Sequence, residues 1–145
     1  MEEIVKLLDT ALQYVRHEVV GKEINIYVKS EKLESECPYC GEASIKVHSR
    51  KNRVVKDLPI QGRKVKLHLE RRKYFCKNPE CSHTTFSERF NFCEPRATTT
   101  NRLQEEILRV SLTQSSVAAS KYLRKSVADV GKSTICNLLK KGLEK

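Results

Sequence analysis

The chain has 145 residues, of which 39% are hydrophobic and 32% are charged, and its formal net charge is +10. This length is typical of one domain or two small ones. No apolar run approaches a membrane span, and the acidic start Met1-Glu2-Glu3 lacks the pattern of a signal peptide, so we expect a cytoplasmic protein without membrane contact. The positive charge favours a phosphate polyanion or an acidic surface as partner, and nothing indicates a small-molecule substrate.

The N-terminal segment predicts an amphipathic helix over residues 1 to about 18. Its apolar side chains recur at helical spacing, at Ile4, Leu7, Leu8, Ala11, Leu12 and Val15. We expect Gly21 to end this helix. Its apolar stripe is expected to pack against the rest of the chain or against a second copy.

The next part of the chain predicts β-strands. Residues 23–30 and 64–74 alternate apolar and polar side chains, which is typical of half-buried strands, and the second is expected to be the longest strand. Shorter strands are predicted at 54–55 and 84–86. Gln61-Gly62 is expected to form a turn.

Four of the six cysteines form two closely spaced pairs, in Cys37-Pro-Tyr-Cys40-Gly41 and in Cys76-Lys-Asn-Pro-Glu-Cys81. Two such pairs can surround one tetrahedral ion, so the spacing predicts one structural zinc bound by Cys37, Cys40, Cys76 and Cys81 in a zinc ribbon. A closed shell of four thiolates leaves no position for catalysis. The alternatives are disulfides, unrelated buried thiols, an iron site, or replacement of one ligand by His83 or Cys93. Cys136 is expected to be a small packing residue.

The sequence after Pro95 changes character. Residues 96–100 predict a linker, and from Asn101 onward the apolar spacing predicts three short helices. The candidate caps are Asn101 with Gln104, then Ser115 or Ser116, and then Ser133. Short helices with basic exposed faces are typical of a helix-turn-helix, although the link between the second and third helices is longer than the tight turn of a minimal one.

The third helix, from Lys132 to Lys141, is the predicted DNA-reading element. Its N-terminal residues are expected to reach phosphates, and Thr134 and Asn137 are expected to reach base edges. Two basic segments of the preceding part are expected to hold further phosphates. The expected DNA contacts are Arg50, Lys51, Arg53, Arg71, Arg72, Lys73, Lys132, Ser133, Thr134, Asn137, Lys140 and Lys141. The alternative is an ordinary amphipathic C-terminal helix.

The residues offer little for catalysis. Gly131-Lys132-Ser133 is not a nucleotide-binding loop, because the earlier glycine that this motif needs is replaced by Ser126. The three aspartates are spread over different predicted elements, and no Ser-His-Asp or Cys-His set is recognisable. We therefore expect no enzymatic activity, including strand cleavage, from this chain alone.

Several short motifs occur in a fixed order after the first cysteine pair. They are Val47-His48-Ser49-Arg50, Asp57-Leu58-Pro59-Ile60-Gln61-Gly62, Arg71-Arg72-Lys73-Tyr74-Phe75-Cys76, Asn78-Pro79-Glu80-Cys81 and Thr85-Phe86-Ser87-Glu88. With the cysteine pair, this order resembles the N-terminal zinc finger of the ISL-three insertion-sequence transposases. In that family a helix-turn-helix and then a DDE-type catalytic domain follow. The resemblance spans roughly residues 20–140 and is looser in the helical part.

The resemblance implies that Cys37, Cys40, Cys76 and Cys81 bind zinc and that the segment from Lys132 to Lys141 reads DNA. The three catalytic carboxylates of the family have no counterpart here, so its strand-transfer chemistry is not carried over. Three origins stay open for such a chain: a fragment, a decayed gene, or a short product that binds ends without cutting.

Taken together, the sequence predicts an α+β fold with a helix at 1–20, a zinc-ribbon domain at 21–95 and a helix-turn-helix domain at 96–145. The expected function is binding of double-stranded DNA at transposon ends, with one structural zinc. The alternative function is a zinc-dependent protein-interaction module for transposase assembly. Whether the chain forms a homo-oligomer stays open.

Overall fold

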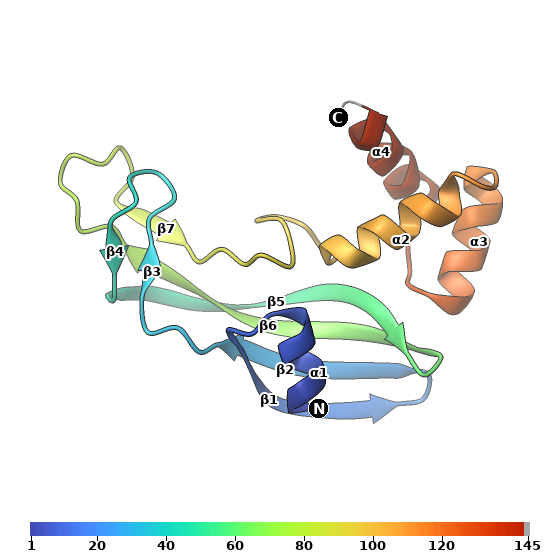
Figure 1. Ribbon diagram of the computed structural model, residues 1–145, viewed down its shortest axis with the longest axis horizontal. Helices are drawn as coiled ribbons and strands as arrows, with labels where there is room; N and C mark the ends of the chain where they lie inside the picture. Colours follow the sequence, from blue (N-terminus) through green and yellow to red (C-terminus); the bar gives the residue numbers. More distant parts are fainter. Residues whose placement is uncertain (144–145) are drawn as a thin grey trace.

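The computed structural model describes residues 1–143 and joins a twisted β-sheet to three packed helices (Figure 1). The elements are α1 (Glu2–Leu8), β1 (Leu12–Val20), β2 (Glu23–Ser30), β3 (Ser35–Glu36), β4 (Ala43–Ser44), β5 (Val47–Ile60), β6 (Arg63–Phe75), β7 (Thr85–Ser87), α2 (Asn101–Ser111), α3 (Ser116–Ser126) and α4 (Lys132–Leu143). The predicted α+β class is confirmed. No helix in this described range is long and apolar enough to cross a membrane.

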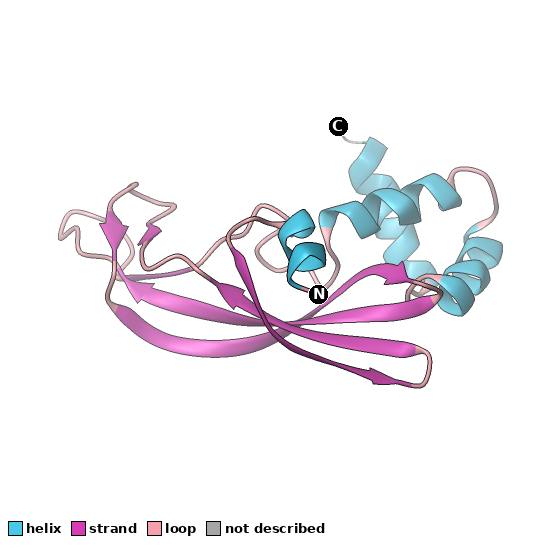
Figure 2. Ribbon diagram, turned by 60° about the horizontal axis from the view of Figure 1, so that its bottom comes forward, coloured by secondary structure: helices cyan, strands magenta, loops and turns pink. Residues whose placement is uncertain are grey.

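The main sheet has the strand order β1-β2-β6-β5, and β7 pairs with the end of β6. β1–β2 and β5–β6 are antiparallel hairpins, whereas the central pair β2–β6 is parallel. Alternating residues of β2 and β6 bury one apolar face, formed by Ile24, Ile26, Val28, Val65, Leu67 and Leu69. The short helix α1 lies on this face and contributes Val5 to the same core (Figure 2).

The predicted N-terminal helix is wrong beyond residue 8. Asp9 ends α1 in an extended conformation, and residues 12–20 form β1, an edge strand paired with β2. The physical reason is that Val15, Val19 and Val20 are β-branched and that pairing with β2 outweighs a weak helical pattern. Gly21 therefore turns a hairpin rather than ending a helix, with φ +58°.

β2, β5, β6 and β7 lie where strands were predicted, whereas β3 and β4 were not predicted. β2 has the predicted bounds, and the turn at Gln61-Gly62 is present, with positive φ at both residues. The strand expected only at 54–55 extends over 14 residues as β5, which makes it one residue longer than β6.

The three C-terminal helices share one apolar core, which includes Leu103, Ile107, Leu123 and Ile135. Two of the expected caps are corrected. The N-cap of α2 is Thr100 rather than Asn101, and Ser133 lies inside the first turn of α4, because α4 begins at Lys132. The expected cap at Ser115 is confirmed, since its hydroxyl accepts from the Ala118 amide at 3.2 Å.

Leu58 of β5 packs against the helical core, and polar side chains join the helices to the sheet at two further places. The carboxylate of Asp57 on β5 accepts from the Thr100 hydroxyl at 2.8 Å and from the Arg102 guanidinium, also at 2.8 Å. Asp57 is buried, with 4% of its side chain exposed. In the link between α3 and α4, Asp129 accepts from the Lys64 ammonium of β6 at 2.8 Å. These contacts hold the helices against the β5–β6 hairpin.

Candidate metal centre and nucleic-acid interface

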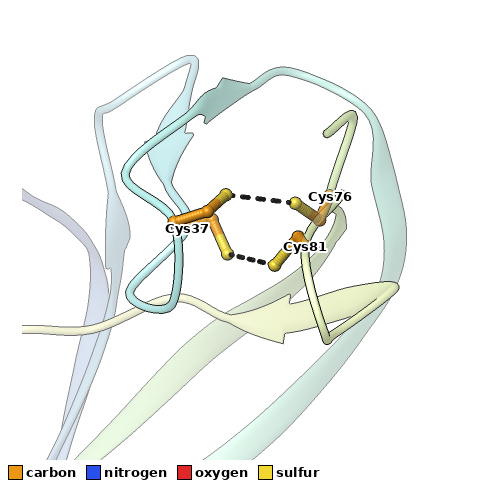
Figure 3. Close-up of side chains that lie close together, drawn as sticks. Cys37, Cys76 and Cys81 are labelled. Carbon is orange, nitrogen blue, oxygen red and sulfur yellow. Dashed lines mark hydrogen bonds between the residues drawn. The ribbon is translucent and has the colours of Figure 1, made fainter. Parts of the chain in front are cut away.

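Two turns bring the four paired cysteines together at one end of the molecule. β3 and β4 form a short hairpin, and Cys37 and Cys40 lie in the turn between them. Cys76 directly follows β6, and Cys81 lies in the loop that leads to β7. Figure 3 shows sulfurs from the two segments facing one another across the gap between them.

The four sulfurs have the spacing of a tetrahedral zinc shell. All lie within 4.8 Å of one another, with Cys37 and Cys81 3.9 Å apart and Cys40 and Cys76 3.6 Å apart. Zinc–thiolate bonds of about 2.3 Å imply an edge of about 3.8 Å between sulfurs of a tetrahedron. The donor set therefore fits one structural zinc, as the sequence predicted.

Backbone hydrogen bonds shape both turns. The Gly41 amide donates to the Cys37 carbonyl at 2.7 Å, and Gly41 has φ +82°, which only glycine adopts without strain. On the other side, the His83 amide donates to the Cys81 sulfur at 3.5 Å. Such amide contacts orient sulfurs and stabilise thiolates.

Cys40 and Cys76 differ in the pKa of their thiols. A hydrogen bond from the Glu42 backbone lowers the pKa of Cys40 to about 7. At Cys76 the Asn78 backbone lowers the pKa, but burial and the neighbouring sulfurs outweigh it and raise the pKa to about 12. Because zinc needs thiolates, its binding releases protons from the cluster.

A small apolar core supports the cluster from beneath. Tyr74 and Phe86 are buried beside Cys37, and their rings stack with centroids 5.7 Å apart. Since β6 and β7 supply these two rings, the ribbon is continuous with the main sheet.

Neither alternative ligand joins the four cysteines. His83 lies next to the site, but its ring stacks on Tyr39 with centroids 3.5 Å apart. Cys93 is buried in the core of the main sheet beside Phe92. The metal-suited group in the described part of the chain consists of Cys37, Cys40, Cys76 and Cys81, and none of the four is in a disulfide.

Two arginines expected to contact DNA point toward a backbone carbonyl of the chain itself. Arg53 and Arg71 both donate to the Pro95 carbonyl, Arg71 at 2.7 Å. Arg71 also donates to the Glu88 carbonyl at 3.0 Å. Burial and the nearby Arg53 charge lower the pKa of Arg71.

Arg72, another expected contact, is largely enclosed. Only 13% of its side chain is exposed, and it donates to the Ser30 carbonyl at 2.8 Å, with Glu88 3.6 Å away. Its charge is thus held inside the chain. By contrast, Arg50 and Lys51 are exposed and Lys73 is half-buried.

The polar residues of α4 lie on its exposed side. Ile135 is fully buried in the helical core, whereas the expected contacts are exposed: Lys132, Ser133, Thr134, Asn137, Lys140 and Lys141. α4 and the cysteine cluster lie at opposite ends of the molecule (Figure 1). The structure thus divides the expected DNA contacts into two separate surfaces.

Sequence reasoning missed two hydroxyl groups in the basic region. Ser49 and Ser87 line the same pocket as Lys51 and Lys73. The register explains this, because Ser49 and Ser87 are both paired with Lys73 of β6. A strand that began at Val47 would have placed Ser49 on the same face as Lys51. The strand predicted from the sequence covered only residues 54–55, so this relation was missed.

Comparison with known protein families gives a match for the segment that holds the four cysteines. Residues 34–81, about a third of the chain, match a model described as the zinc-finger of transposase IS204/IS1001/IS1096/IS1165. This segment is therefore similar to the zinc ribbon of ISL3-type transposases. No curated protein and no solved structure gives a significant match to the chain. The family match includes the four cysteines and stops before α2, so it does not test the predicted role of the helices.

Proposed function

We propose that the chain binds double-stranded DNA at transposon ends, with α4 reading the sequence and the zinc ribbon supporting the sheet. The observation that carries this proposal is the exposed polar face of α4, which is held outward by the buried Ile135. A helix that presents short polar and basic side chains can enter a major groove and contact base edges. The net charge of +10 supports a polyanionic partner.

Within this proposal, α3 and α4 act as the helix-turn-helix pair. Residues 127–131 link them, which is longer than a minimal turn but keeps both helices on one core. Lys132 and Ser133 contact phosphates at the start of α4, Thr134 and Asn137 contact bases, and Lys140 and Lys141 contact the backbone further along.

Zinc has a structural role in this proposal. Cys37, Cys40, Cys76 and Cys81 are assigned as its four ligands, and this closed shell leaves no coordination position for a substrate. The ion would join the turn of the β3–β4 hairpin, whose strands have two residues each, to the turn between β6 and β7. We therefore assign the four cysteines a structural role and not one in strand cleavage.

The test is Asn137→Ala, after a preferred duplex has been selected from a random library. We expect the variant to lose about 1–3 kcal/mol of binding free energy on the preferred duplex and little on a scrambled one. Gln13→Ala is the matched control, because Gln13 is an exposed amide on β1, away from α4.

Fluorescence anisotropy over a salt series measures both affinities. Unchanged discrimination by a folded Asn137→Ala protein would show that another residue reads the bases. If the wild-type chain binds no duplex even at low salt, DNA binding itself is the wrong function.

The second candidate is a protein-interaction module for transposase assembly. It is favoured by exposed apolar side chains around the ribbon, with Leu33 85%, Ile45 62% and Tyr39 51% exposed. Replacing Leu33 and Ile45 by serine would then reduce self-association in sedimentation velocity while zinc content stays the same. Unchanged sedimentation would count against this candidate.

A further inference from the structure

A cationic pocket opens where β5, β6 and β7 meet, between the cysteine cluster and the core of the main sheet. Its volume is about 320 Å³, which lies in the range of small-ligand sites. Its lining includes Lys51, Arg53, Arg71 and Lys73 together with the hydroxyls of Ser49 and Ser87, and no acidic residue.

The register of the sheet forces these positive charges together. Lys51 is directly opposite Arg71 in the β5–β6 ladder, and Lys73 is opposite Ser49. Like charges at directly opposed positions destabilise a sheet. None of these three cations has an ion pair with an acidic side chain among the described residues.

The two arginines of the pocket are partly fixed in place. Arg53 and Arg71 converge on the Pro95 carbonyl, a neutral acceptor that cannot compensate two positive charges. Glu88, the nearest acid in the hydrogen-bond network, is engaged with Arg72. The pocket therefore keeps an excess of positive charge, and the hydroxyls of Ser49 and Ser87 in its lining are further donors.

We propose that this pocket binds one phosphate group of duplex DNA, with Lys51, Lys73, Ser49 and Ser87 as its direct donors and Arg53 and Arg71 as fixed positive charges behind them. The inference deepens the proposed DNA-binding function and rests on it. It assigns a phosphate contact to a surface formed by β5, β6 and β7, outside α4. A duplex bound by both α4 and this pocket would contact the chain at two separate surfaces.

The test compares wild-type protein, the double variant Lys51→Gln/Lys73→Gln, and the control Lys22→Gln, which removes an exposed lysine at the β1–β2 turn. We expect the double variant to bind preferred and scrambled duplexes more weakly by the same factor. The slope of log K against log salt should fall by about 1 relative to wild type and to the control. Equal slopes for the double variant and the control would overturn the proposal.

A second measurement keeps the pocket testable if DNA binding itself fails. Inorganic phosphate is titrated against chloride at constant ionic strength, and the amide resonances of Ser49, Lys51 and Ser87 are followed by NMR. If wild type binds no duplex but these resonances shift saturably, the pocket takes free phosphate and the DNA assignment is overturned. If neither phosphate nor DNA shifts them, the pocket is not a phosphate site.

Discussion

At the residue scale, Asp57 connects the sheet to the helices through one buried carboxylate. It accepts from Thr100, the N-cap of α2, and from Arg102 in the first turn of the same helix. The hydrogen bond with Asp57 raises the pKa of Arg102. A single side chain of β5 thus fixes both the start and the direction of α2.

Replacing Asp57 by alanine should lower the free energy of unfolding by about 1–3 kcal/mol, because a buried hydroxyl and a guanidinium lose their acceptor. Urea unfolding followed by circular dichroism measures this loss. The control is Glu23→Gln, which breaks the exposed pair with Lys66 at 3.0 Å and should cost less than about 1 kcal/mol. Similar losses in both variants would show that the Asp57 contacts contribute little.

Single residues were predictable where their chemistry is local. The four cysteines could be assigned from spacing alone, because two short turns determine which thiols face the metal. The positions of Arg71 and Arg72 could not, because their acceptors on Ser30, Glu88 and Pro95 come from distant parts of the chain. A cluster of basic residues in the sequence does not indicate which of their side chains stay available to bind a partner.

At the element scale, the ribbon depends on its metal. β3 and β4 have only two residues each, and the core beneath the cysteines is small. Structural zinc contributes on the order of 10 kcal/mol, largely as folding energy. The helical core lies elsewhere and contains none of these residues.

Chelation or Cys40→Ser should therefore unfold the ribbon and leave α2–α4 largely formed. Elemental analysis should find about one zinc per wild-type chain, and amide hydrogen exchange should report loss of protection around β3, β4 and β7. Cys136→Ser, in α4, is the matched control and should retain zinc. Folded protein that contains no zinc would contradict this prediction.

The turn between β5 and β6 offers a stabilising change. Gln61 has φ 49° and Gly62 has φ 74°, so both central residues lie in the left-handed region. Asparagine tolerates this conformation better than glutamine, and Asn-Gly is the preferred pair for such a hairpin. Gln61→Asn should raise the free energy of unfolding by about 0.5 kcal/mol. The same change at Gln13, in the strand β1, should not stabilise; equal effects at both sites would refute the turn argument.

Helices and strands were predictable where the apolar residues of a segment follow a single spacing. The alternation in residues 23–30 gave the correct bounds of β2, because its buried face is continuous. Residues 12–20 were misassigned, because Leu12 and Val15 continue a helical spacing by chance and β1 is mostly exposed, which leaves no clear alternation. The parallel pairing of β2 with β6 was not predictable, since nothing local in either strand specifies a distant partner.

At the scale of the whole molecule, the sheet and the helices have separate cores, which are joined by polar contacts and by Leu58 of β5, which packs against the helical core. We expect the sheet and the helices to unfold together in the wild-type protein. Unfolding of either part would break the hydrogen bonds of Asp57 with Thr100 and Arg102, and the other part would lose their stabilisation. Hydrogen exchange should give similar opening free energies for peptides of β6 and of α2. In Asp57→Ala the helices should open at lower free energy than the sheet; identical values in both proteins would show that the joint does not couple them.

The parallel pairing of β2 and β6 has a kinetic consequence. Ile24 is aligned with Val65 and Val28 with Leu69, so the centre of the sheet forms only after a long stretch of chain has closed into a loop. Closing such a loop slows folding more than local hairpins do. Zinc that binds early to Cys40 and Cys76 would bring the C-terminal end of β6 close to the segment that follows β2. The two strands would then need less time to find their parallel alignment. Refolding should therefore accelerate with zinc, so that the ion acts on the rate at which the native sheet is reached as well as on its final stability.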